Sequence, residues 1–168
     1  MKKIGLLSDT HGYIDDRILH FFKDRDEIWH AGDWGSIEVS DKLSSVTKVR
    51  GVYGNIDGRE IRLVYPESNR FVIEELDVWI THIGGYPGKY AINVREQLKA
   101  NPPDLFICGH SHIIRIEKDQ KLNLIYINPG AAGISGFHKV RTLVLFEINK
   151  SKLENMKVVE LGARGELK

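Results

Sequence analysis

The chain has 168 residues, about the size of one domain, so residues 1–168 are expected to form a single domain. The 24 lysines and arginines nearly balance the 23 aspartates and glutamates, and the formal net charge is +1. That balance argues against electrostatic binding of nucleic acid or of an anionic membrane, and no apolar run approaches the roughly 20 residues that span a bilayer. The single cysteine, Cys108, excludes an intrachain disulfide, so a cytoplasmic location is expected.

The first half of the chain alternates strand and helix patterns. Short apolar runs predict strands at residues 3–8, 27–30 and 46–53. Apolar side chains at helical spacing predict helices at residues 15–23 and 36–44, the second with Ser36 as its N-cap.

The second half is mostly strand. Residues 69–73 and 78–82 predict a hairpin, and residues 90–100 predict a helix that ends before Pro102 and Pro103. Further strands are predicted at residues 105–108, 122–127, 142–148 and 156–161, the last two nearly forming a meander. Two facing sheets with helices outside satisfy this pattern, so the expected fold class is α/β (α+β).

Metal-ligand side chains follow five of the predicted strands, at the point where each strand ends. The segments are Ser8-Asp9-Thr10-His11-Gly12, His30-Ala31-Gly32-Asp33, Gly51-Val52-Tyr53-Gly54-Asn55, Thr81-His82 and Gly109-His110-Ser111-His112. In α/β sheets, ligands collect beyond the carboxyl ends of the strands. The pattern therefore predicts one site that contains Asp9, His11, Asp33, Asn55, His82, His110 and His112.

The donor types indicate which ions this site would bind. Two carboxylates, one amide and four imidazoles, with no thiolate, suit divalent manganese, iron, cobalt, nickel or zinc. Seven donors are too many for one tetrahedral ion, but they suit two ions about 3.5–4 Å apart with a carboxylate between them. Manganese is the first expectation for both ions.

Each segment taken alone has a simpler explanation. Asp9 could cap a helix, and Asn55 is a good turn former. His82 could be a hydrogen-bonded interior histidine, and the pair at His110 and His112 could lie in a solvated loop. Five strand ends that all carry metal-ligand side chains are hard to obtain from caps and turns, so the metal interpretation is preferred.

Taken in order, Asp9-x-His11, Gly32-Asp33, Gly54-Asn55-x-Asp57, His82 and Gly109-His110-Ser111-His112 resemble the calcineurin-like metallophosphoesterase superfamily. The short length is similar to its small bacterial and archaeal phosphodiesterase branch. The resemblance implies a four-layer αββα sandwich of two mixed sheets. It also implies that Asp9, His11 and His112 hold one ion, that Asn55, His82 and His110 hold the other, and that Asp33 bridges them with a water or hydroxide.

The expected activity is therefore hydrolysis of a small phosphoester, most simply a phosphodiester, by attack of the bridging hydroxide, with Asp33 and Asn55 as catalytic residues. Many superfamily members have a histidine after the glycine-asparagine pair that protonates the leaving group. This chain has Ile56 there, which cannot donate a proton, so esters with good leaving groups should react best. Two alternatives are a non-catalytic scaffold resembling a retromer subunit, and a nuclease. Assembly into a homo-oligomer is a further expectation from the resemblance.

Three other residues receive expectations of their own. Trp34 directly follows Asp33 and is expected to line the mouth of the site. His30 is expected to orient neighbouring groups rather than bind metal. His138 lies in the segment after Asn128-Pro129-Gly130, where this chain departs from the family's usual residues. It is interpreted as a loop residue, with substrate contact as the lesser alternative.

Overall fold

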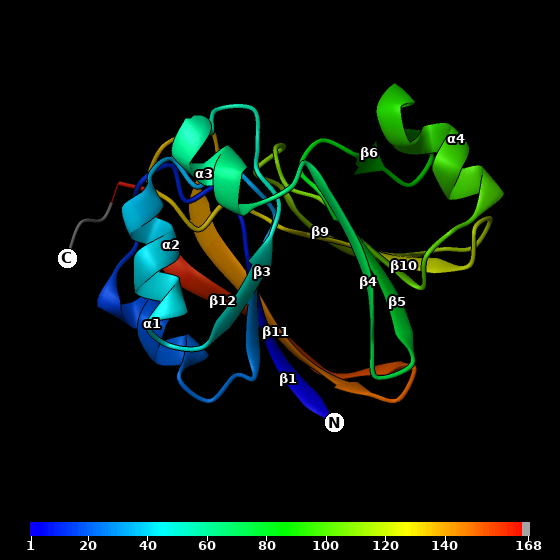
Figure 1. Ribbon diagram of the computed structural model, residues 1–168, viewed down its shortest axis with the longest axis horizontal. Helices are drawn as coiled ribbons and strands as arrows, with labels where there is room; N and C mark the ends of the chain where they lie inside the picture. The colour runs from blue at the N-terminus through cyan, green and yellow to red at the C-terminus, as the bar shows by residue number, and fades with distance from the viewer. Residues whose placement is uncertain (166–168) are drawn as a thin grey trace.

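The computed structural model describes residues 1–165 and contains two five-stranded sheets that face each other (Figure 1). The first sheet has the order β12-β11-β1-β2-β3, and the second has the order β4-β5-β8-β10-β9. The first consists of β1 (Lys2–Leu7), β2 (Glu27–His30), β3 (Lys48–Gly51), β11 (Val140–Asn149) and β12 (Lys152–Ala163). The second consists of β4 (Ser68–Ile73), β5 (Leu76–Thr81), β8 (Leu105–Ile107), β9 (Ile114–Asp119) and β10 (Leu124–Pro129).

Both sheets are mixed. In the first sheet β1, β2 and β3 run parallel, while β11 pairs antiparallel with both β1 and β12. In the second sheet β5, β8 and β10 run parallel, and β4 and β9 are antiparallel strands at the edges. The predicted α/β (α+β) fold with two mixed sheets is confirmed. Residues 166–168, the last three of the predicted domain, lie outside the described residues.

Helices cover the outer faces of both sheets. Figure 1 shows α1 (Asp16–Phe22), α2 (Ile37–Ser44) and α3 (Arg59–Val64) on the side of the first sheet, and α4 (Ile92–Ala100) on the side of the second. A short ribbon of β6 (Gly85–Tyr86) and β7 (Lys89–Tyr90) precedes α4. Within residues 1–165, no helix has the length and apolar composition needed to cross a membrane.

Three apolar clusters join these four layers, and the alternation of side chains along the strands explains them. Leu105 and Ile107 of β8 point into the core between the sheets, whereas Phe106 points outward and packs with Leu98 of α4. On the other outer face, Phe22 of α1 belongs to the cluster that covers the first sheet. Burying each such side chain contributes roughly 1.5–3 kcal/mol to the free energy of unfolding.

Most predicted elements are present, and the differences have local causes. Helix α1 begins where expected because the carboxylate of Asp15 accepts a hydrogen bond from the Ile18 amide at 3.0 Å. Ser36 occupies the N-cap position of α2, but its side chain makes no capping hydrogen bond. The sequence did not predict α3, which buries only Ile61, nor β9, an edge strand dominated by charged residues. The strand predicted at residues 46–53 is shorter, Lys48–Gly51.

Candidate metal centre

The seven predicted side chains gather at one edge of the sandwich, beyond the carboxyl ends of parallel strands. Asp9 and His11 follow β1, Asp33 follows β2, and Asn55 lies in the loop after β3, all in the first sheet. His82 follows β5, while His110 and His112 follow β8, both strands of the second sheet. Because parallel strands end at the same edge, loops distant in sequence meet here.

The backbone of these loops is unusual. Left-handed φ angles occur at Asp9 (54°), His11 (47°), Asp33 (58°), His110 (69°) and His112 (61°). Each such residue costs on the order of 1 kcal/mol, and such strain persists where the surroundings impose it. Here the loops hold one another: the His11 amide donates to the Asp33 carbonyl at 3.1 Å, and the His110 amide donates to Asp9 Oδ2 at 3.1 Å. Four of the seven candidate ligands are thus held by contacts between loops.

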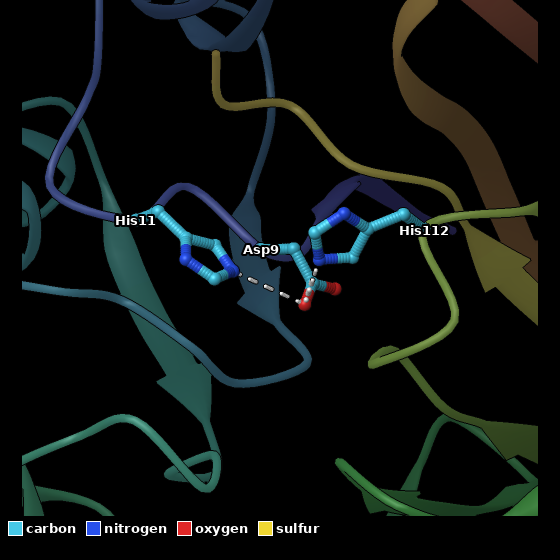
Figure 2. Close-up of side chains that lie close together, drawn as sticks. All are labelled: Asp9, His11 and His112. Atoms are coloured by element: carbon cyan, nitrogen blue, oxygen red, sulfur yellow. Dashed lines mark ion pairs between the residues drawn. The ribbon is translucent and has the colours of Figure 1, made fainter. Parts of the chain in front are cut away.

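Asp9, His11 and His112 form the first group, shown in Figure 2 with both imidazoles directed toward the carboxylate. Asp9 Oδ1 lies 3.0 Å from His112 Nε2 and 3.7 Å from His11 Nε2. The Asp9 carboxylate is completely buried, and the Ser8 hydroxyl donates to its other oxygen at 2.6 Å. One oxygen is therefore held by the protein, while the other faces the two histidines.

Asp33, His82 and His110 form the second group. Asp33 Oδ2 lies 3.2 Å from His82 Nε2, and it also lies 3.5 Å from His11 Nε2 of the first group. Asn55 joins the second group through its Oδ1 atom, 3.0 Å from His110 Nδ1. The carboxylate of Asp33 therefore stands between the two groups.

Gly54 allows the Asp33 loop and the Asn55 loop to approach each other. A Cβ atom at position 54 would collide with the Asp33 carboxylate. The Ile56 amide donates to Asp33 Oδ1 at 3.1 Å, which leaves Oδ2 directed toward the histidines. The glycine and this hydrogen bond together orient the shared carboxylate.

Both carboxylates are ionised in the folded protein. Burial acts to raise the pKa of Asp9, but its contacts with His11 and His112 outweigh burial and hold that pKa well below its ordinary value. Burial opposes ionisation of Asp33 too, but its contact with His82, the charge of that histidine and the hydrogen bond from the Ile56 amide together outweigh burial, so the pKa of Asp33 is also lowered. Two negative charges thus face a space that is lined by imidazole nitrogens.

Several buried polar atoms at this centre lack partners. Within residues 1–165, four buried side-chain nitrogen or oxygen atoms have no hydrogen-bond partner, and three of them are Asp9 Oδ1, His11 Nε2 and His82 Nε2. An unpartnered buried polar group costs about 1–3 kcal/mol, so native structures rarely tolerate three in one place. Cations bound at the two groups would satisfy all three atoms, and the residues present therefore fit metal binding.

His82 shows how the protein fixes a histidine for this purpose. Its Nδ1 atom lies 2.7 Å from the carbonyl oxygen of Ala31, and because a carbonyl only accepts, Nδ1 carries the proton. In the neutral ring, Nε2 then presents its lone pair toward Asp33. That tautomer is the one that binds a metal ion through Nε2.

Two clefts reach the second group from the surface. One, of about 410 Å³, is lined by Tyr53, Asn55, Arg62, His82 and Ile83 among others. The other, of about 360 Å³, is lined by residues that include Tyr86, Tyr90 and His110. A small substrate could therefore approach the second group through either cleft.

One expectation for a residue around the centre was wrong, and one was incomplete. Trp34 does not line the mouth: it is fully buried, stacks between His30 and Tyr65, and donates its indole N–H to the Val52 carbonyl at 2.8 Å. His138 lies in a loop, between β10 and β11, as expected, but it is only 8% exposed and its Nδ1 atom lies 3.2 Å from His112 Nδ1. Nothing local in the sequence signals that contact, which joins residues 26 positions apart.

A two-sheet sandwich with two groups of oxygen and nitrogen donors at one edge defines a class of metal-binding α/β proteins. Within that class, this chain belongs to the calcineurin-like phosphoesterase superfamily, whose domain model matches residues 1–151. The family is metal-dependent, and the match supports a phosphoesterase hydrolase.

Curated relatives agree with this family. A probable metallophosphoesterase of Methanothermobacter thermautotrophicus is 30% identical over 167 residues, which cover 95% of this chain and 93% of the relative. A probable metallophosphoesterase of Mycoplasma pneumoniae is 33% identical over 146 residues, or 80% of this chain and 81% of the relative.

Solved structures share the fold. An archaeal phosphodiesterase superposes with a TM-score of 0.74 at 22% identity, covering 95% of this chain and 99% of that one. Vps29 of Entamoeba histolytica, solved with zinc, superposes with a TM-score of 0.73 at 18% identity, covering 97% of this chain and 99% of that one.

Proposed function

We propose that this chain is a phosphodiesterase that uses two divalent metal ions, manganese first among them, to hydrolyse a small phosphoester. The observation that carries the proposal is the position of Asp33 between two groups of donors whose buried atoms lack partners. In this proposal Asp9, His11 and His112 hold one ion, Asn55, His82 and His110 hold the other, and Asp33 contacts both. Iron, cobalt, nickel and zinc suit the same donors.

Two bound ions would supply a water of lowered pKa and would neutralise charge on the phosphate oxygens. The side chains of Asp33 and Asn55 would position the ions and the substrate. Asp33, with Oδ1 held by the Ile56 amide, keeps Oδ2 at the centre between His11 and His82. Asn55 lines the larger cleft, where its amide can donate to a phosphate oxygen of the substrate.

Ile56 shapes the leaving-group side of the proposed reaction. Its side chain is 46% exposed, and its backbone amide is bound to Asp33. An isoleucine has no proton to donate, so a departing oxygen leaves without acid assistance from this position. Phosphoesters with good leaving groups are therefore the substrates that this centre favours.

Two alternatives use the same fold. Vps29 structures share the fold, so a non-catalytic scaffold is one alternative. The metal-ligand side chains at all seven positions of this chain favour an enzyme instead. A nuclease would share the chemistry, and the near-neutral charge of this chain argues against it. A single domain, a cytoplasmic location, a homo-oligomer, and the lack of nucleic-acid or membrane partners all stay predictions.

The proposal is tested by hydrolysis of bis(4-nitrophenyl) phosphate and of the matching monoester. The metal-stripped protein is assayed alone and then with Mn²⁺, Ni²⁺, Zn²⁺ or Mg²⁺. We expect metal-restored cleavage that prefers the diester and that falls by about 10³-fold in Asp33→Asn, because this carboxylate serves both ions.

Asp41→Asn on the exposed surface of α2 provides a matched carboxylate-to-amide control and should retain full activity. Verified binding of two ions without cleavage of either ester would contradict the enzyme and favour the scaffold.

A further inference from the structure

His138 packs against a candidate ligand, although it lies outside both groups of donors. It belongs to the loop between β10 and β11 and is 8% exposed. Its Nδ1 atom lies 3.2 Å from His112 Nδ1, and the two rings meet edge to face with centroids 5.1 Å apart. The contact joins loops from different parts of the chain, so the folded structure is needed to see it.

The hydrogen-bond partners of His138 fix the direction of this contact. His138 Nε2 lies 2.8 Å from the carbonyl oxygen of Gly133, which can only accept, so Nε2 carries the proton. In the neutral ring, His138 Nδ1 is then an acceptor. The proton between the two Nδ1 atoms must therefore belong to His112.

This direction determines which nitrogen of His112 is free. With its proton on Nδ1, neutral His112 has a lone pair on Nε2, which lies 3.0 Å from Asp9 Oδ1. Asp9 Oδ1 itself has no hydrogen-bond partner. A lone pair and a carboxylate oxygen that face each other require a cation between them.

We propose that His138 is a positioning residue that holds His112 as the tautomer with its proton on Nδ1 and its lone pair aimed at the first metal site. The inference rests on the proposed function only in taking His112 as a metal ligand. The backbone carbonyl of Ala31 fixes the tautomer of His82 in the same way. At His112 the acceptor is a side chain, so mutation can remove it.

Gly136 supports this assignment. Its φ is +135°, and a Cβ atom there would collide with His112 Nδ1 and lie 3.1 Å from His138 Nδ1. The backbone of residue 136 thus closes over the point where the two rings meet. Only a glycine leaves that contact undisturbed.

The test compares zinc binding by the wild type with three variants. His138→Asn keeps an acceptor, because the asparagine Oδ1 can stand near the position of Nδ1. His138→Phe keeps a ring without an acceptor, and Gly136→Ala disturbs the contact itself. We expect the affinity of the first site for Zn²⁺, measured by calorimetric titration, to fall 10- to 100-fold in the last two and to stay within about 3-fold in His138→Asn. The second site, where Ala31 positions His82, provides the internal control.

Nitrogen-15 spectra of the zinc-loaded wild type give a result that needs no variant. They should show a proton on His112 Nδ1 and none on His138 Nδ1. The opposite pattern overturns the proposal, as does a His138→Phe variant that binds zinc as tightly as the wild type, or a His138→Asn variant as weak as His138→Phe. Zinc binding with the expected spectra but without ester cleavage would overturn the proposed function alone, whereas a chain that binds no zinc would overturn both.

Discussion

Each donor group contains one aspartate and two histidines, and Asn55 joins the second, but the two groups differ in access to solvent. In the first group the side chains of Asp9, His112 and His11 are 0%, 12% and 20% exposed. In the second group Asp33 and His82 are 3% exposed, but His110 is exposed, and one cleft is lined by His82 and the other by His110. We infer that the first group retains its ion, whereas the second presents its ion to the substrate. In the proposed two-metal centre, the difference in exposure would thus give the two ions different tasks.

The largest expected effect comes from removing one ligand of each group. Both His112→Ala and His110→Ala should lower the rate of diester cleavage by about 10³-fold, because catalysis needs both ions. The two variants should differ in metal content: His110→Ala keeps one tightly held manganese ion per chain, and His112→Ala loses it. Elemental analysis after gel filtration measures this difference. Equal loss of the same ion from both variants would contradict the inferred difference between the two groups in how tightly they hold metal.

A smaller effect concerns the leaving group on the open side of the centre. The wild type should cleave aryl esters at least about 100-fold faster than alkyl esters, because Ile56 supplies no general acid. Ile56→His should raise the alkyl rate about 10-fold and change the aryl rate little, and Ile56→Gln serves as the polar control without an acid. Rates over a series of leaving groups test this expectation. A wild-type rate independent of leaving-group pKa would count against it.

The smallest effect concerns His30, which supports both groups. Its ring hydrogen-bonds to Thr10, between Asp9 and His11, and accepts from the amide of Gly32, which precedes Asp33. Complete burial lowers the pKa of His30 from 6.5 to about 3. Below pH 6.5 the unfolded chain therefore takes up a proton that the folded chain does not. This part of the stability is complete above pH 6.5 and is lost as the pH falls toward 3.

Between pH 6.5 and 5, the loss amounts to about 2 kcal/mol in the free energy of unfolding. Urea denaturation of the metal-free protein at several pH values should show this slope in the wild type. The slope should be smaller in His30→Gln, whose side chain does not titrate. Other titrating groups contribute to both proteins, so only the difference between the two slopes is diagnostic. Parallel slopes would mean that His30 is not kept neutral by the fold.

The sequence predicts the donors better than their surroundings. Asp9 and Asp33 lie within three residues of the ends of apolar strands, so their place at the sheet edge depends on local pattern alone. The contact of His138 with His112 depends on how two loops fold together, and no spacing in the sequence encodes it. Trp34 adjoins Asp33 in sequence, but its ring turns into the core, where it stacks on His30. Neighbours along the chain are thus a poor guide to which side chains line a cavity.

Each donor group takes side chains from both sheets: Asp9 and Asp33 from the first, His112 and His82 from the second. A metal ion bound in either group would therefore act as a non-covalent cross-link between the two halves of the sandwich. The ion could bind only after residues as distant in sequence as Asp9 and His112 had come together. Metal binding would therefore stabilise the folded state and not the unfolded chain. At a free metal concentration 100 times the dissociation constant, each link adds about 2.7 kcal/mol to the stability. The bound ions would thus stabilise the fold as well as support catalysis, so removing them with a chelator would lower both the free energy of unfolding and the activity.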